Sequence, residues 1–158
     1  MAAAERIRDI VKDPGLTVGP RAEALLYAAA RAQLVDQVIL PALARGEVVV
    51  ADRFIDSSLA YQGVARGLGL EQVLQANELA TGGLMPDITL LLELPTELAA
   101  ARRGDTPDRI ESESDGFHAA VAEGFAAAAA RFPERIHVVD ASGPPRAVLA
   151  RVREAANL

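Results

Sequence analysis

Three short apolar runs place the strongest constraint on how this chain folds. They span residues 47–51 (EVVVA), 87–94 (DITLLLEL) and 135–140 (RIHVVD), and each is rich in β-branched and aliphatic side chains. Such continuous apolar runs are typical of parallel strands that are covered on both faces. Because they alternate with helical patterns, they predict right-handed βαβ units in an α/β fold, with helices flanking a parallel sheet.

Helical periodicity fills the sequence around these runs. Gly19-Pro20 opens the longest helix, and we expect Pro41 and Gly46 to end it. Shorter helices are predicted over residues 4–11, 70–80, 117–132 and 147–156, over a short segment that starts near Asp56, and after a cap at Thr96. With no repeat or linker between them, all 158 residues are predicted to form a single domain.

Composition excludes several classes of site. The sequence contains no cysteine, so it has no disulfide framework and no thiolate for a metal or a nucleophile. His118 and His137 are the two histidines, too few for an imidazole metal cluster. Arginine occurs fifteen times, whereas Lys12 is the single lysine. Any chemistry that needs a lysine therefore has one candidate residue.

Charge and hydropathy restrict the partners and the location of the protein. The formal net charge of −6 argues against non-specific binding of nucleic acid or of an anionic membrane. No apolar run reaches the roughly 18 residues that a membrane-spanning helix needs, and the N-terminus does not have the pattern of a secretory signal. The sequence thus predicts a cytoplasmic protein that binds neither nucleic acid nor membranes.

Polar residues gather after the first apolar run. Asp52 and Arg53 follow it directly, at the end of a strand where open α/β sheets bind their ligands. Arginine there offers a planar fork of donors to phosphate oxygens, although a plain ion pair with neighbouring helices is the alternative. Ser58, Tyr61 and Gln62 follow on the same short segment, and this mixture is unusual for a solvated face.

Two further segments are candidates. Tyr27 and Arg31 lie four residues apart in the long helix, so both project from one face and could hold a planar base. A core tyrosine beside a surface arginine is the alternative. The segment 102–111 is a charged loop with glycine and proline, which is typical of a lid over phosphates and equally of an ordinary exposed connection.

These segments together resemble a known family. Four segments occur in the order typical of bacterial thymidylate kinase, and the resemblance covers nearly the whole chain. They are AEALLYAAARAQ, PALARGEVVVADRFIDSSLAYQGVARGLG, LATGGLMPDITLLLEL and DRIESE. It implies a P-loop NTPase-like fold of the nucleoside monophosphate kinase type, and transfer of the γ-phosphoryl group of ATP to dTMP. It also implies Mg²⁺ as cofactor and a homodimer. Such phosphoryl transfer relies on cationic stabilisation, which suits an arginine-rich site.

The resemblance assigns roles to individual residues. Arg53 is expected to clamp the acceptor phosphate, with Asp52 near the water shell of Mg²⁺. A lid is expected over about 102–115. The remaining assignments are Tyr27 stacked on thymine, Arg31 donating to a base carbonyl, Ser58 near the other base edge, Tyr61 against the deoxyribose, Gln62 beside sugar and phosphate, and Arg102, Arg103 and Arg109 toward the ATP phosphates.

One part of the family pattern is not found in this sequence. The family opens with a strand and a GxxGxGK[ST] loop, and no such run occurs among the 158 residues; Lys12 lies in a polar helix without the preceding glycines. We therefore expect the first βαβ portion to be absent and the chain by itself to be inactive. The alternatives to an active dTMP kinase are an inactive fragment that keeps a dTMP half-site or a dimerising surface, and a kinase for another nucleoside monophosphate.

Overall fold

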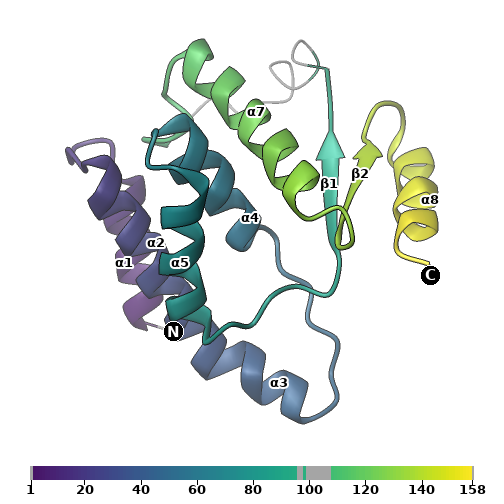
Figure 1. The fold of residues 1–158 in the computed structure, drawn as a ribbon, viewed down its shortest axis with the longest axis horizontal. Coiled ribbons are helices and arrows are strands. Elements are labelled where there is room, and N and C mark those ends of the chain that lie inside the picture. The colour runs from purple at the N-terminus through teal and green to yellow at the C-terminus, as the bar shows by residue number, and fades with distance from the viewer. Residues whose placement is uncertain (1, 96–97, 99–107, 158) are drawn as a thin grey trace. The chain divides into compact units, whose positions relative to one another are not determined.

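The computed structural model describes residues 2–95, 98 and 108–157. The chain divides into two compact units, and Figure 1 draws the helices and strands of both. The first comprises Met1–Met85 and Asp108–Phe125, and the second comprises Pro86–Pro107 and Ala126–Leu158. Apart from Leu98, the expected helix after Thr96 lies outside the described residues, as does the part of the expected lid over 102–107.

The first unit is helical. Its α-helices are α1 (Ala2–Lys12), α2 (Pro20–Leu34), α3 (Leu40–Ala44), α4 (Ile55–Ser58) and α5 (Leu70–Thr81), and its π-helical segments are η1 (Val35–Ile39) and η2 (Leu59–Ala65). Helix α2 is central, since it packs against α1, α5 and η2. Pro20 starts it, as proline favours the first helical turn. Gly82, at φ 61°, ends α5 in the left-handed conformation that glycine adopts freely.

The prediction that Pro41 and Gly46 end the long helix is wrong for Pro41 and confirmed for Gly46, which follows the last helical turn. Segments α2, η1 and α3 follow one another without interruption to Ala44. Proline has no amide proton, and its ring collides with the preceding turn of a regular α-helix. The wider π-helical turn of η1 lies just before Pro41 and lets the chain pass it. Gly46, at φ 75°, then turns the chain away.

The second unit contains the sheet. Strands β1 (Thr89–Glu93) and β2 (Ile136–Asp140) pair in parallel, with Thr89 opposite Ile136 and Glu93 opposite Asp140. Helix α8 (Pro145–Ala155) packs against β2. Helix α7 (Asp115–Arg131) gives its first residues to the first unit and its last to the second. The predicted parallel pairing of these two runs is confirmed, within a helix-rich α/β fold.

The third predicted strand is wrong. Residues 47–51 are not assigned to a strand, and the side chains of Val48 and Val50 are 90% and 92% exposed. A β-strand is stable only when its backbone pairs with a neighbour. Among the described residues none pairs with 47–51, so the apolar run stays irregular.

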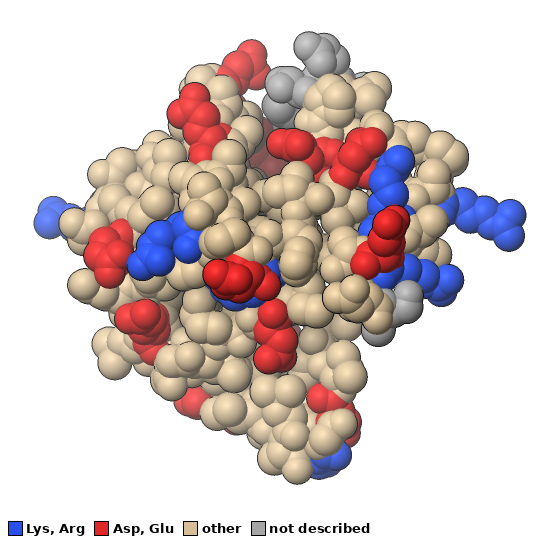
Figure 2. Space-filling model, turned by 45° about the vertical axis from the view of Figure 1, so that its right-hand side comes forward, with Lys and Arg blue, Asp and Glu red and all other residues tan. Residues whose placement is uncertain are grey.

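Surface charge agrees with the acidic composition. On the face drawn in Figure 2, acidic side chains lie among the basic ones. Within the described part of the chain, that face shows no uninterrupted basic patch of the kind that non-specific nucleic-acid binding uses. No helix in the described ranges is long and apolar enough to cross a membrane.

Candidate functional site

One face of α2 organises the candidate site. Glu23, Tyr27 and Arg31 lie four residues apart and therefore project from the same side of the helix. The Glu23 side chain is fully buried, whereas Tyr27 and Arg31 are partly buried. Each end of this face carries a cluster of polar contacts, which we name the Arg31 cluster and the Glu23 cluster.

The Arg31 cluster holds a guanidinium with neutral oxygens. Arg31 Nη2 donates to the Phe54 carbonyl at 3.0 Å and to Ser58 Oγ at 3.1 Å, and Nη1 donates to Asn77 Oδ1. Asn77 Nδ2 donates in turn to the Val73 carbonyl at 2.7 Å, which fixes the amide with its oxygen toward Arg31. Arg31 and Ser58, which were assigned to different edges of the base, thus lie in direct contact.

Burial perturbs this guanidinium. It lowers the pKa of Arg31 to about 10, although the nearby Asp56 carboxylate acts in the opposite direction. The hydrogen bonds that hold the group come from uncharged acceptors, so they compensate the lost hydration only in part. A ligand carbonyl that accepts from this guanidinium would add a favourable contact to a charge that is poorly solvated.

Arg53 lies on the segment that leads into α4. It is exposed, and its φ of 67° lies in the left-handed region that non-glycine residues rarely adopt. Nη1 donates to the Tyr61 hydroxyl at 3.4 Å, and the guanidinium carbon lies 5.4 Å from the centroid of that ring. Strain of roughly 1–2 kcal/mol that persists at an exposed arginine is typical of functional sites.

Aromatic packing holds Tyr61 in place. Its ring meets those of Phe117 and Phe125 edge-on, with both centroids at 6.1 Å. The backbone beneath it is also close-packed, because a Cβ atom added at Gly124 would lie 2.6 Å from Ala60 Cα. Helix α7 therefore needs glycine at position 124 to approach η2.

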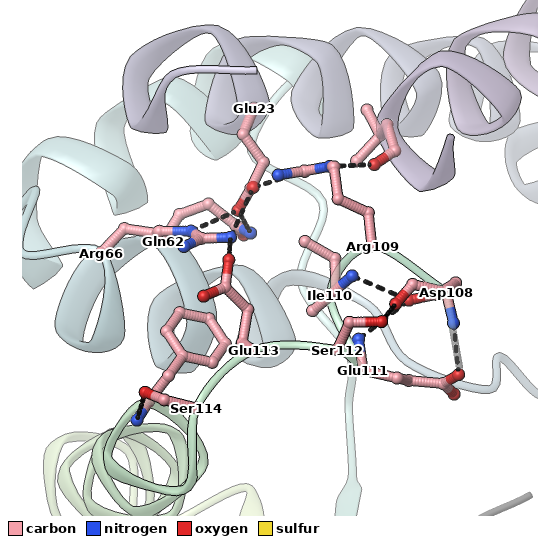
Figure 3. A network of polar contacts seen from close by, with 12 residues as sticks. Glu23, Gln62, Arg66, Asp108, Arg109, Ile110, Glu111, Ser112, Glu113 and Ser114 are labelled. Atoms are coloured by element: carbon pink, nitrogen blue, oxygen red, sulfur yellow. Dashed lines mark hydrogen bonds and ion pairs between the residues drawn. The ribbon is translucent and has the colours of Figure 1, made fainter. Parts of the chain in front are cut away.

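The Glu23 cluster neutralises its own charges (Figure 3). Glu23 Oε1 accepts from Gln62 Nε2 at 2.8 Å and from Arg66 Nε at 3.2 Å. Its Oε2 accepts from Arg66 Nη2 at 3.1 Å and from Arg109 Nη2 at 2.6 Å. Glu113 supplies a second carboxylate, 2.7 Å from Arg66 Nη2. Two acidic and two basic groups therefore balance.

The pKa values in this cluster favour the charged forms. Burial alone would raise the pKa of Glu23, but hydrogen bonds from Arg66, Gln62 and Arg109 lower it below its ordinary value. Burial opposes the charge of Arg66 as well, yet the contacts with Glu23 and Glu113 raise its pKa. Tyr27 has a raised pKa because it is buried and lies near the Glu23 and Asp108 carboxylates.

The structure brings most of the predicted residues into the first unit. Gln62 is buried against Glu23, and Arg109 donates to Glu23 and, through Nε, to the Val11 carbonyl at 2.7 Å. Their assigned contacts with sugar and phosphates stay predictions. Asp52 is exposed. The predicted lid residues Arg102 and Arg103 lie outside the described residues.

Sequence reasoning missed two residues that organise the site, Glu23 and Asn77. Glu23 continues the four-residue spacing of Tyr27 and Arg31, which was a usable signal for a residue on the same face. Asn77 lies in α5 near the buried Val73 and Leu74. A polar residue among apolar helix positions predicts a buried hydrogen bond, but its partner cannot be identified from the pattern.

Comparison with known proteins identifies the relatives of this chain. The model of the family "Thymidylate kinase" matches residues 1–152. A thymidylate kinase of Caldanaerobacter subterraneus subsp. tengcongensis is 50% identical over 137 residues, which cover 86% of this chain and 66% of that protein. The thymidylate kinase of Alkalilimnicola ehrlichii is 50% identical over 157 residues, covering 96% and 71% respectively. That of Lactobacillus delbrueckii subsp. bulgaricus is 48% identical over 156 residues, covering 95% and 74%. The chain thus spans 66% to 74% of the length of these relatives.

Proposed function

Since the chain belongs to the thymidylate kinase family, we propose that it acts in the transfer of the γ-phosphoryl group of ATP to dTMP, with dTDP as product. The described part supplies the acceptor site of a P-loop NTPase-type enzyme. The match over residues 1–152 supports the reaction, and the geometry of the first unit supports the acceptor site.

The observation that carries this proposal is the state of Arg31. Its guanidinium is buried, oriented by Asn77 and Ser58, and poorly compensated for the loss of water. A rigid donor of this kind suits a neutral carbonyl at the edge of a base. Tyr27, one helical turn away, is the ring proposed to stack on thymine.

The phosphate end of the acceptor is assigned to the segment after residue 51. Arg53 is exposed and strained, and its guanidinium is free to leave the Tyr61 hydroxyl for a phosphate oxygen at little cost, because 3.4 Å is a long hydrogen bond. Tyr61 then borders the deoxyribose. Arg102, Arg103 and Arg109 are proposed to face the phosphates of ATP.

Asp52 fits the proposed Mg²⁺ site. It offers one exposed carboxylate beside Arg53. In the described part of the chain no three His, Cys, Asp or Glu side chains gather as metal ligands. Mg²⁺ needs no such cage, because it is held mainly by nucleotide phosphates and waters with one or two carboxylates. When bound, the ion would neutralise phosphate charge, and Asp52 would orient one of its waters.

A homodimer and a cytoplasmic location are part of the same proposal. Apolar side chains are exposed along the long helix, where Leu25 is 63% exposed and Val38, Leu40 and Leu43 are exposed as well. A surface of this kind favours association. Sedimentation equilibrium should give a dimer mass, and Leu25→Glu should shift the protein toward the monomer.

Nucleotide binding tests the acceptor site. Calorimetric titration should show dTMP binding more tightly than CMP or UMP. Arg53→Ala should lower the affinity for dTMP by at least about tenfold and the affinity for thymidine by less than about twofold, because the lost guanidinium binds the phosphate. Arg31→Lys should lower the affinity for both ligands by at least about tenfold, because Arg31 binds the base. Equal binding of all nucleotides would contradict the assignment to dTMP.

Turnover tests the reaction. ADP release should be measured with ATP, Mg²⁺ and dTMP on the 158-residue chain, beside a protein extended by the codons upstream of Met1. Turnover by the extended protein would support the kinase, and binding without turnover in both would favour the inactive-fragment reading. Comparable turnover by the two proteins would contradict the expectation that the ATP site needs a GxxGxGK[ST] loop outside this sequence.

A further inference from the structure

Glu23 is a buried carboxylate that has no part in the proposed contacts with nucleotide. It is fully inaccessible to solvent, yet it is ionised and accepts four hydrogen bonds. Taking a carboxylate out of water is costly unless cations and donors surround it. The residues that donate to Glu23 are therefore held in fixed positions around it.

Three other segments converge on Glu23 and α2 (Figure 3). Gln62 and Arg66 come from η2 and the residue that follows it, and Arg109 comes from the segment Asp108–Glu113. Arg109 also donates to the Val11 carbonyl, so the end of α1 joins the same network. The contacting residues lie 39 to 86 positions from Glu23 in the sequence.

The segment Asp108–Glu113 is held by these polar contacts, by the Arg109 amide on the Lys12 carbonyl at 3.2 Å and by one buried apolar side chain. Asp108 Oδ1 accepts from the amides of Ile110 and Glu111 at 2.9 and 3.0 Å, which forms a local turn. Its Oδ2 lies 3.0 Å from Lys12 Nζ, at the half-exposed end of α1. Arg109 on Glu23 and Glu113 on Arg66 provide its polar attachment, and the buried Ile110 packs in a core cluster with Ala60, Phe117 and Val121.

The same carboxylate fixes two residues that follow Tyr61 in η2 and at its end. Gln62 follows Tyr61 directly, and Arg66 closes η2 with its amide on the Tyr61 carbonyl at 2.9 Å. The guanidinium of Arg66 lies 4.4 Å from the ring centroid of Phe117, which packs against Tyr61. Tyr61 in turn contacts Arg53.

We propose that Glu23 is a positioning residue, a buried anchor that fixes Asp108–Glu113 and η2 on α2 and, through Tyr61, orients Arg53 for the acceptor phosphate. The anchoring stands on the contacts alone, whereas the effect on the phosphate rests on the proposed function. A purely structural role would stabilise the fold without any preference for the phosphate end of the ligand.

The test uses Glu23→Gln in the full chain, with Glu47→Gln as the matched control. The substitution removes the charge at nearly constant shape, and Glu47 is an exposed carboxylate paired with Arg45 at 2.6 Å. In short hydrogen–deuterium labelling pulses, the amides of 110–113 should exchange at least about tenfold faster in Glu23→Gln, while those of β1 and β2 stay unchanged. Glu47→Gln should match the parent throughout.

Ligand binding separates positioning from general stabilisation. Glu23→Gln should lower the affinity for dTMP by at least about fivefold and the affinity for thymidine by less than about twofold, so the preference for the phosphorylated ligand falls. Equal weakening of both ligands, or unchanged exchange at 110–113, would overturn the proposal. If Glu23→Gln does not fold, Arg109→Gln must show the same faster exchange at 110–113, and its failure to do so would also overturn it.

The exchange and binding measurements distinguish failure of the anchor from failure of the proposed function. If the parent binds neither dTMP nor thymidine, the proposed function has failed, and the exchange measurement alone still decides whether Glu23 is the anchor. If the parent binds dTMP and the exchange is unchanged, the anchor has failed and the acceptor site stands.

Discussion

The Arg31 cluster and the Glu23 cluster lie on one face of α2, and both bury a charged group. At Glu23 the buried charge meets opposite charges, and the pKa values of Glu23 and Arg66 move toward the ionised forms. At Arg31 the hydrogen bonds come from neutral oxygens, and burial lowers the pKa to about 10. The charges of the Glu23 cluster are paired in the free protein, whereas the Arg31 guanidinium would gain a further hydrogen bond from a ligand.

This difference separates stability from binding. A self-neutralised network resists the loss of any member, because the remaining charges stay buried without a partner. A buried cation whose hydrogen-bond acceptors are neutral, even with the Asp56 carboxylate nearby, contributes less to folding, but it can donate to a ligand oxygen without breaking an ion pair. Substitutions in the two clusters should therefore have opposite profiles for unfolding and for ligand affinity.

The largest expected effect is on stability at Glu23. Glu23→Gln leaves Arg66 and Arg109 beside a neutral amide, so we expect the free energy of unfolding to fall by about 3–5 kcal/mol. Urea denaturation followed by circular dichroism measures this change. The control Glu47→Gln, at an exposed ion pair with Arg45, should not change the midpoint measurably. A comparable loss in both variants would contradict the special status of Glu23.

The next effect is on affinity at Arg31. Arg31→Lys keeps the charge but loses the planar fork, so dTMP affinity should fall by about 1.5–3 kcal/mol while the free energy of unfolding falls by only about 1–2 kcal/mol. Calorimetry and urea denaturation on the same preparation give both values. A larger loss in the free energy of unfolding than in the free energy of dTMP binding would contradict the distinction between the two clusters.

A packing change tests η2, the segment that carries Tyr61 and Gln62. Gly124→Ala places a Cβ 2.6 Å from Ala60 Cα, in the first turn of η2, and backbone must move to accept it. We expect a loss of about 1–3 kcal/mol in unfolding free energy from this overpacking. Gly116, where an added Cβ meets only Ser114 Oγ at 3.8 Å, gives the control Gly116→Ala, which should cost far less.

Local patterns predicted the elements well because the relevant forces are local. Strands β1 and β2 and helices α1, α5, α7 and α8 lie within two residues of the predicted ranges. The family assignment, confirmed by the match over 1–152, came from ordered motifs and not from periodicity. The strand at 47–51 failed because pairing depends on a partner elsewhere, which β-propensity does not supply.

The site was predicted in part for the same reason. Tyr27 and Arg31 followed from helix spacing, and Ser58 from its motif. The burial of Glu23 depends on Arg66 and Arg109, which are 43 and 86 residues away in sequence. A glutamate in the first turn of a helix is usually explained by the helix dipole and solvent exposure, so its spacing indicates which face it lies on but not that it is buried. The left-handed backbone of Arg53 also has no sequence signal.

The smallest expected effect is the pH dependence that Glu23 alone contributes. Its folded pKa lies below the ordinary value of 4.5, so the folded state binds fewer protons than the unfolded state in the acidic range. The stability that the carboxylate provides is therefore fully present above pH 4.5 and is lost as the pH falls through the folded pKa. The difference in unfolding free energy between the parent and Glu23→Gln should stay constant from about pH 7 to pH 5 and then shrink by up to about 1.4 kcal/mol per pH unit. Urea denaturation of both proteins across this range measures it. A difference that stays constant, or grows, as the pH falls below the ordinary pKa would mean that folding does not lower the pKa of Glu23, and the contrast with the Arg31 cluster would then rest on hydrogen bonds alone.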